Sequence, residues 1–124
     1  MNYTLNFAHL CDYASLSAGK LNVLGIFENI NSSTFPYVHP QMYVVTNIHF
    51  SDPGNYTEEI RITLGEETIA HHKEEIPIHN SNTDLGVIGQ LNNTEFKTDG
   101  NYSLDILVNG AIVKKIPFTV VKRI

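Results

Sequence analysis

The sequence predicts an all-β protein, an antiparallel β-sandwich of about eight strands that forms one domain over residues 1–124. Apolar runs recur at intervals of about ten residues, a spacing typical of sandwiches and barrels. Clusters of Gly, Asn, Asp, Ser and Pro separate these runs and favour turns. Near the end, Asn109-Gly110 lies between two runs of β-branched residues. Asn-Gly is the pair that best tolerates positive φ at both central positions of a tight type I′ turn.

The strands can be justified in chain order from their patterns. The segment 42–50 presents one strongly apolar face, and the segment 58–64 alternates Ile60 and Ile62 with charged residues, so one of its faces should meet solvent. The segment 68–76 contains helix-forming residues, but Gly65 just before it suits a hairpin connection and favours a strand. The expected strands are 3–13, 20–30, 42–50, 58–64, 68–76, 85–91, 102–108 and 111–121.

The last two strands form a hairpin whose regular register cannot continue to its end. A two-residue loop places Asp105 opposite Lys114, an opposite-charge pair. If the pairing ran on, Leu104 would lie opposite Lys115, and the apolar residues that follow would point to the wrong face. One extra residue corrects this, so a β-bulge is predicted at Lys114-Lys115. The bulge returns three apolar residues to the core face, namely Ile116, Phe118 and Val120.

Length and composition limit the classes of function. A chain of 124 residues can bury a core without disulfides. Its formal net charge of −5, with only 8 basic residues, argues against a nucleic-acid partner. No apolar run approaches the roughly 20 residues that span a bilayer, so no membrane partner is expected. The single cysteine and the lack of signal-peptide features at the N-terminus favour a cytoplasmic location.

Three stretches that span nearly the whole chain carry a family resemblance: LCDYASLSAGKLNVLGIFENI, FPYVHPQMYVV and GNYSLDILVNGAIVKKIPFTV. Together they resemble an uncharacterised family of small bacterial proteins. The resemblance implies a Leu-Cys-Asp element, a turn to Gly-Lys-Leu, a Leu-Gly-x-Phe strand and a Pro-x-x-His-Pro element, but no established activity. The closing hairpin is also similar to that of immunoglobulin-like sandwiches, although their Trp and disulfide are lacking. The matching residues are Leu10, Cys11, Asp12, Gly19, Lys20, Leu21, Leu24, Gly25, Phe27, Pro36, His39 and Pro40.

Asp12 is the most unusual polar residue, because it interrupts the apolar run from Leu10 to Ala14, where an unpaired carboxylate would be costly to bury. One interpretation is a binding or acid–base carboxylate whose pKa is tuned by burial, with Lys20 as its neighbour. The favoured interpretation is structural, with the side chain facing solvent or accepting backbone hydrogen bonds near a strand end.

Cysteine and histidine provide further candidates. Cys11 with His9 as base could act as a nucleophile, but the sequence supplies no stabiliser for the developing charge, so a buried structural thiol is favoured. His39, in the stretch PYVHP, is expected to fix a rigid loop between restrictive prolines.

A metal site is the hypothesis raised by the remaining histidines. His71 and His72 are adjacent, so a strand points them to opposite faces. The possible site contains two histidines, of which His79 is the second, and Glu74 or Glu75 as a further ligand. The spacing of these residues matches no known metal-binding motif. Solvated histidines are therefore expected. No catalytic, cofactor-binding or metal-binding residue is assigned.

The leading functional hypothesis is a non-enzymatic protein-binding or assembly module that uses loops or an edge strand for a protein partner or for self-association. The alternative is a site for a small ligand or carbohydrate, or a hydrolase, that uses Asp12 with Tyr and Asn side chains. A closed pocket with convergent carboxylates would favour the alternative, whereas a flat apolar patch or a paired edge would favour the module.

Overall fold

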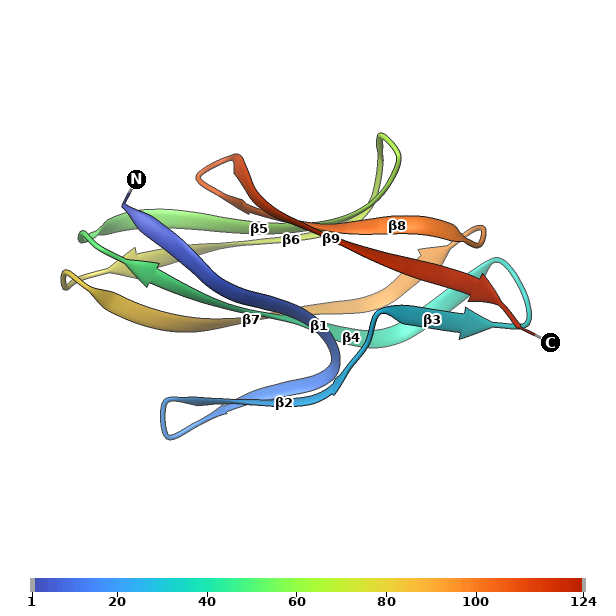
Figure 1. The fold of residues 1–124 in the computed structure, drawn as a ribbon, viewed down its shortest axis with the longest axis horizontal. Helices are drawn as coiled ribbons and strands as arrows, with labels where there is room; N and C mark the ends of the chain where they lie inside the picture. Colours follow the sequence, from blue (N-terminus) through green and yellow to red (C-terminus); the bar gives the residue numbers. More distant parts are fainter. Residues whose placement is uncertain (1, 124) are drawn as a thin grey trace.

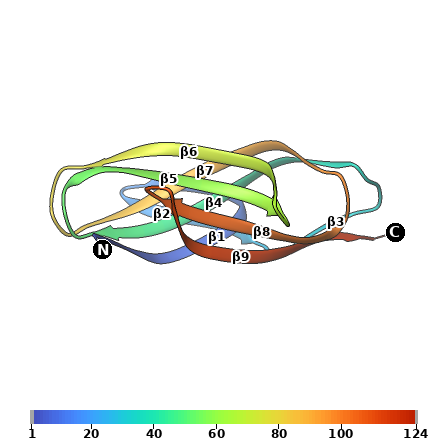
Figure 2. The ribbon, with the colours of Figure 1, turned by 90° about the horizontal axis from the view of Figure 1, so that it is seen from above.

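The computed structural model describes residues 2–123, which form nine strands arranged in two sheets that pack face to face (Figures 1 and 2). Residues 2–123 begin and end at opposite ends of the molecule. Residues 2–123 contain no helix, and so none long and apolar enough to cross a membrane. The strands are β1 (Tyr3–Ser17), β2 (Lys20–Ile26), β3 (Asn29–Ser32), β4 (Tyr37–Phe50), β5 (Gly54–Leu64), β6 (Glu67–Ile78), β7 (Thr83–Phe96), β8 (Gly100–Val108) and β9 (Ala111–Lys122).

The first sheet has the order β2-β1-β4-β7 and the second the order β3-β9-β8-β5-β6. The expected strand 20–30 is in fact two strands, because the chain leaves β2 at Ile26 and crosses to the second sheet. There β3 pairs in parallel with β9, which departs from the predicted antiparallel arrangement. Ile30 of β3 is buried in the core between the sheets, and this burial favours the crossing.

The main core lies between the sheets and takes one face of each. The predicted apolar face of β4 is confirmed, since Val44, Ile48 and Phe50 are buried. Ile60 and Ile62 of β5 enter the core from the second sheet, as their alternation predicted. The segment with helix-forming composition is strand β6, because its hairpin with β5 places Ile76 and Ile78 in the apolar interior.

The β8–β9 hairpin contains a bulge, but not at the predicted position. Leu107 lies opposite Ile112, whereas Ile106 lies opposite Lys114, so the extra residue is Val113. Asp105 therefore faces Lys115 instead of Lys114. This position lets Lys115 Nζ donate a hydrogen bond to Asp105 Oδ2 at 3.2 Å, which compensates a buried carboxylate. The predicted return of Phe118 and Val120 to the core is confirmed, and Ile116 is partly buried and packs against the core.

Two tyrosines fix the corners where the chain changes sheets. The Tyr102 hydroxyl donates to the carbonyl oxygen of Thr98 at 2.7 Å, between β7 and β8. The Tyr56 hydroxyl donates to the carbonyl oxygen of Asp52 at 2.8 Å, between β4 and β5. Both rings lie in the apolar interior, so each residue joins core packing to a loop backbone.

Candidate functional site

The most distinctive feature of the surface is a hairpin at one edge of the first sheet that extends beyond the pairing of β1 with β4. Strand β1 pairs with β4 only from Tyr3 to Cys11, and its remaining residues pair with β2. We call residues 12–26 the β1–β2 arm. Figure 1 shows this arm in blue, projecting below the two sheets. The long β1 strand therefore belongs to the sheet at its start and to the arm at its end.

The inner side of the arm packs on the outer face of the first sheet. Ala14 packs with Cys11 of β1 and with Tyr43 and Val45 of β4 in a second, small core. At the next contact, Leu21 lies directly over Gly86 of β7. A Cβ at Gly86 would lie 2.8 Å from Leu21 Cγ, which is too close for an unshifted contact. Leu21 can therefore pack directly on β7 because Gly86 has no side chain.

The outer side of the arm leaves apolar side chains in solvent. Leu24 is 62% exposed, Ile26 55% and Tyr13 47%. Leu24 lies directly opposite Tyr13 in the β1–β2 ladder. Strand β2 is also the last strand of its sheet, so among residues 2–123 no strand pairs with its outer edge. The arm therefore combines unpaired backbone groups with exposed apolar side chains.

The other sheet edges are protected in ways that β2 is not. Strand β3 has only four residues, and β7 lies against β6 of the opposite sheet. Short length, coverage and charge are the usual protections against unwanted strand pairing. Strand β2 carries a single charged residue, Lys20, at its end beside the turn. Strand β6, by contrast, carries Glu67, Lys73, Glu74 and Glu75 with three further polar residues.

Asp12 lies at the base of the arm, where it is exposed. Its carboxylate packs against Gly25, which has a φ of +70°, and a Cβ at Gly25 would collide with it. Lys20 is not its neighbour, since it pairs with Ser17 at the tip of the arm, about 15 Å further along the strand. The structural interpretation therefore accounts for Asp12 and Gly25 together, because a conformation with positive φ suits glycine.

The charge of Asp12 acts on His39, a relation that sequence analysis missed. Burial lowers the pKa of the His39 imidazole, and the negative charge of Asp12 partly opposes this effect. The Tyr37 hydroxyl lies 3.0 Å from His39 Nδ1, and the Phe27 ring centroid lies 6.0 Å from that of His39. His39 is part of strand β4, so its expected place in a rigid loop was wrong. Motif elements far apart in the sequence thus meet where the arm begins.

Cys11 and His9 do not form a nucleophile with its base. Cys11 is completely buried beneath the arm, and burial raises the pKa of its thiol. His9 instead stacks on Phe7, with ring centroids 5.7 Å apart. The expectation of a buried structural thiol agrees with this position.

The candidate metal ligands are separated as well. His71 is exposed and His72 is half-buried, in agreement with the prediction that they point to opposite faces. His72 Nε2 lies 3.2 Å from Glu74 Oε1, while His79 follows the end of β6. Over residues 2–123, no three His, Cys, Asp or Glu side chains are grouped as a metal site requires.

Glu58 is a buried carboxylate that sequence analysis overlooked. It accepts a 2.6 Å hydrogen bond from Thr46 Oγ1 across the two sheets. Burial raises the pKa of Glu58, as does the charge of Glu74 opposite it on β6, while the Thr46 bond and His72 lower it. The signal was present, because Glu58 occupies the same alternating face as Ile60. Its compensated burial suits a structural role.

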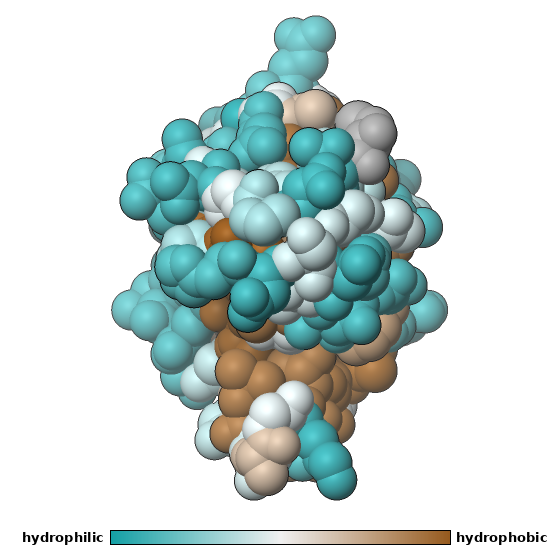
Figure 3. All heavy atoms as spheres, turned by 90° about the vertical axis from the view of Figure 1, so that its left-hand side faces the viewer, coloured by the Kyte–Doolittle hydropathy of each residue, from teal (hydrophilic) through white to brown (hydrophobic). Residues whose placement is uncertain are grey.

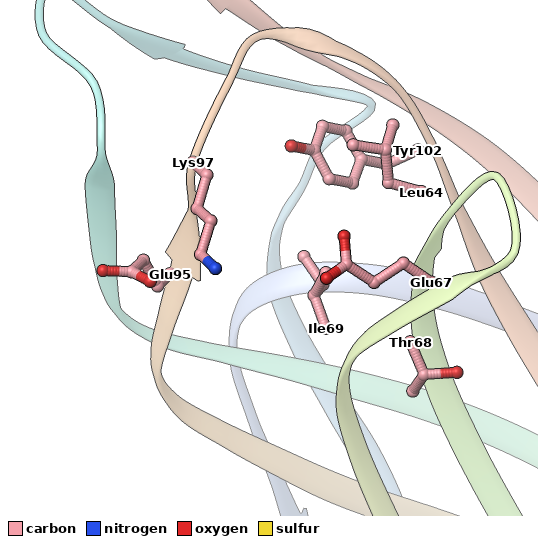
Figure 4. A pocket seen from close by; sticks show the side chains of 7 residues that line it. All are labelled: Leu64, Glu67, Thr68, Ile69, Glu95, Lys97 and Tyr102. Carbon is pink, nitrogen blue, oxygen red and sulfur yellow. The ribbon is translucent and has the colours of Figure 1, made fainter.

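A pocket of about 240 Å³ lies at the end of the molecule where β5 turns into β6 (Figure 4). Leu64, Ile69 and Tyr102 form its apolar part. Figure 4 shows the Glu67 carboxylate directed into the pocket and that of Glu95 directed away. These carboxylates do not converge, so the pocket lacks the arrangement that would favour a hydrolase.

Two facing sheets, with an unprotected edge on a projecting arm, make this chain a small all-β protein. The chain belongs to a family of unknown function, DUF6941, whose model matches residues 6–121. No curated protein matches its sequence. Among solved structures, it is similar to the alkylpurine DNA glycosylase AlkC of Pseudomonas fluorescens bound to DNA containing an abasic site analog. The TM-score is 0.51 and the identity 9%, over 91% of this chain but only 30% of the glycosylase, so the similarity concerns the fold alone.

Proposed function

We propose that this protein is an immunoglobulin-like β-sandwich that acts as a non-enzymatic protein-binding module, with the outer edge of β2 receiving an extended strand of a partner protein. Two features support the immunoglobulin-like assignment. Strand β3 pairs in parallel with the last strand, and Tyr102 bonds back to Thr98 as in a tyrosine corner. A reducing, cytoplasmic setting is part of the proposal and is supported by the single free thiol of Cys11.

The unprotected edge of β2 carries the functional proposal. An added strand would satisfy backbone groups along this edge, and main-chain hydrogen bonds of this kind provide affinity in strand addition. Leu24 and Ile26 would supply apolar contacts that are otherwise left in solvent. The strand is seven residues long, enough for several ladder hydrogen bonds. Asp12 does not favour the alternative hydrolase, because it is exposed and packs against Gly25.

Photo-crosslinking can test the proposal. A photoreactive amino acid is placed at Leu24, and in a matched variant at Ile112, which is 50% exposed on β9 of the other sheet. The Leu24 probe should capture a specific partner in cells that naturally produce the protein. The purified partner should then bind wild-type protein and the Ile112→Lys variant, but not Leu24→Lys. Equal capture at both positions, or binding that survives Leu24→Lys, would refute strand addition at β2.

A further inference from the structure

A groove of about 320 Å³ lies where the tip of the β1–β2 arm approaches the seam between β6 and β7. Figure 3 views this end of the molecule and shows apolar surface gathered in its lower part, beside the projecting tip. Leu16 of the arm forms one wall of the groove and is 55% exposed. Ile76 of β6, with Leu85 and Ile88 of β7, lines the remainder. The groove can therefore accept an aliphatic side chain.

The rim of this groove is acidic. Glu74 and Glu75 of β6 both line it, and no Lys or Arg among residues 2–123 does. The nearest basic residue along β6 is Lys73, which lies opposite Glu59 in the ladder with β5. Glu58, which lies opposite Glu74 in the β5–β6 ladder, is buried behind this rim. A cation next to the apolar group would find complementary charge here.

We propose that the groove binds an aliphatic side chain of the partner protein that is adjacent in sequence to a Lys or Arg. This inference rests on the proposed function, because the groove and the β2 edge belong to the same arm. Leu16 lies opposite Leu21 of β2, one strand spacing or about 5 Å inside the open edge. A partner segment that follows β2 and passes the tip can thus contact both places.

The net charge of the protein also argues against a second copy of this chain as the molecule that binds in the groove. The protein has a net charge of −5, and two copies repel each other. Strand β2, which carries the exposed Leu24 and Ile26, offers only Lys20 as a cation, at one end. A basic partner gains attraction at both Glu74 and Glu75, whereas a copy of this chain brings a net negative charge to the same acidic rim.

Selection from a library of short random peptides displayed on phage, with the immobilised wild-type protein as bait, tests the proposal. The enriched peptides should share an aliphatic residue next to Lys or Arg. Their affinity, measured by fluorescence anisotropy, should fall roughly tenfold in Leu16→Ser, which removes an exposed wall of the groove, and severalfold in Glu75→Gln. Ile112→Ser and Glu66→Gln are matched controls outside the groove and should bind like wild type.

Each outcome has a definite meaning. Failure to enrich any peptide, enrichment of peptides without basic residues, or affinity unchanged in Leu16→Ser and Glu75→Gln would overturn the groove proposal. Self-association of the wild-type protein that disappears in Leu16→Ser would overturn it as well, in favour of a second copy. Leu24→Ser, on the edge of β2, is measured in the same assay, and a loss of affinity in this variant alone would refute the groove and leave strand addition at β2 standing. A loss in the groove variants alone would refute strand addition and retain the groove.

Discussion

Replacing Lys115 by Met tests the register of the β8–β9 hairpin, because the bulge decides which of two adjacent lysines reaches Asp105. The Lys115 Nζ lies 3.2 Å from Asp105 Oδ2. The Asp105 side chain is only 6% exposed, whereas that of Lys115 is 60% exposed. Asp105 keeps one other bond, a 2.6 Å hydrogen bond donated by Ser103 Oγ. Lys115→Met therefore leaves a buried carboxylate with one of its two side-chain hydrogen bonds.

The magnitude follows from these exposures. A hydrogen bond to a charged group contributes about 1.5–3 kcal/mol, and solvent screening of the exposed ammonium reduces this contribution. We expect Lys115→Met to lower the free energy of unfolding by about 1 kcal/mol, which shifts a urea midpoint by about 0.5 M at a typical slope. Lys114→Met is the matched control. Lys114 is exposed and has no ion pair within residues 2–123, so its replacement should cost less than about 0.5 kcal/mol.

Urea denaturation of both variants under identical conditions tests which of the two lysines stabilises Asp105. A larger loss in Lys114→Met would mean that the hairpin keeps the regular register of a two-residue loop, with Asp105 opposite Lys114. Equal losses would mean that the Lys115 bond adds nothing to stability. A double-mutant cycle with Asp105→Asn should give a coupling energy for Lys115 and none for Lys114.

Three further predictions concern buried groups. Because the pKa of Glu58 is raised in the folded state, its contribution to stability is full below the unfolded pKa and is lost as pH rises through the folded pKa. The free energy of unfolding of Glu58→Gln should therefore rise relative to that of the wild type between acidic and neutral pH. Chemical denaturation of both proteins over a pH series can check this. Tyr102→Phe should cost about 1 kcal/mol in chemical denaturation, because it removes the bond to the Thr98 carbonyl. Cys11 should react slowly with iodoacetamide in the folded protein, because its thiol is buried. Gly86→Ala should accelerate this reaction, because the added methyl group displaces Leu21 and the arm with it. An unchanged rate would show that the arm does not cover the thiol.

Much of the fold could be predicted because strand signals are local. Alternation identified the buried face of β5 through Ile60 and Ile62, and the same alternation, followed back to Glu58, could have revealed the buried carboxylate. The Asn109-Gly110 turn and the need for an extra residue in β9 were also visible, since both depend on neighbouring residues. The position of the bulge was not, because it depends on the contact that satisfies Asp105.

The candidate site was the part that sequence patterns could not reveal. The segment 20–30 has continuous strand character in the sequence. It is divided into two strands because Ile30 is buried in the core, where it belongs to the second sheet, while Leu24 pairs in the first sheet. The packing of Leu21 on Gly86, and that of Phe27 against His39, join segments that are far apart in the chain. Strand identity follows from the preferences of consecutive residues. The arm, its open edge and its groove follow from the free energy of packing distant segments, which only the tertiary structure settles.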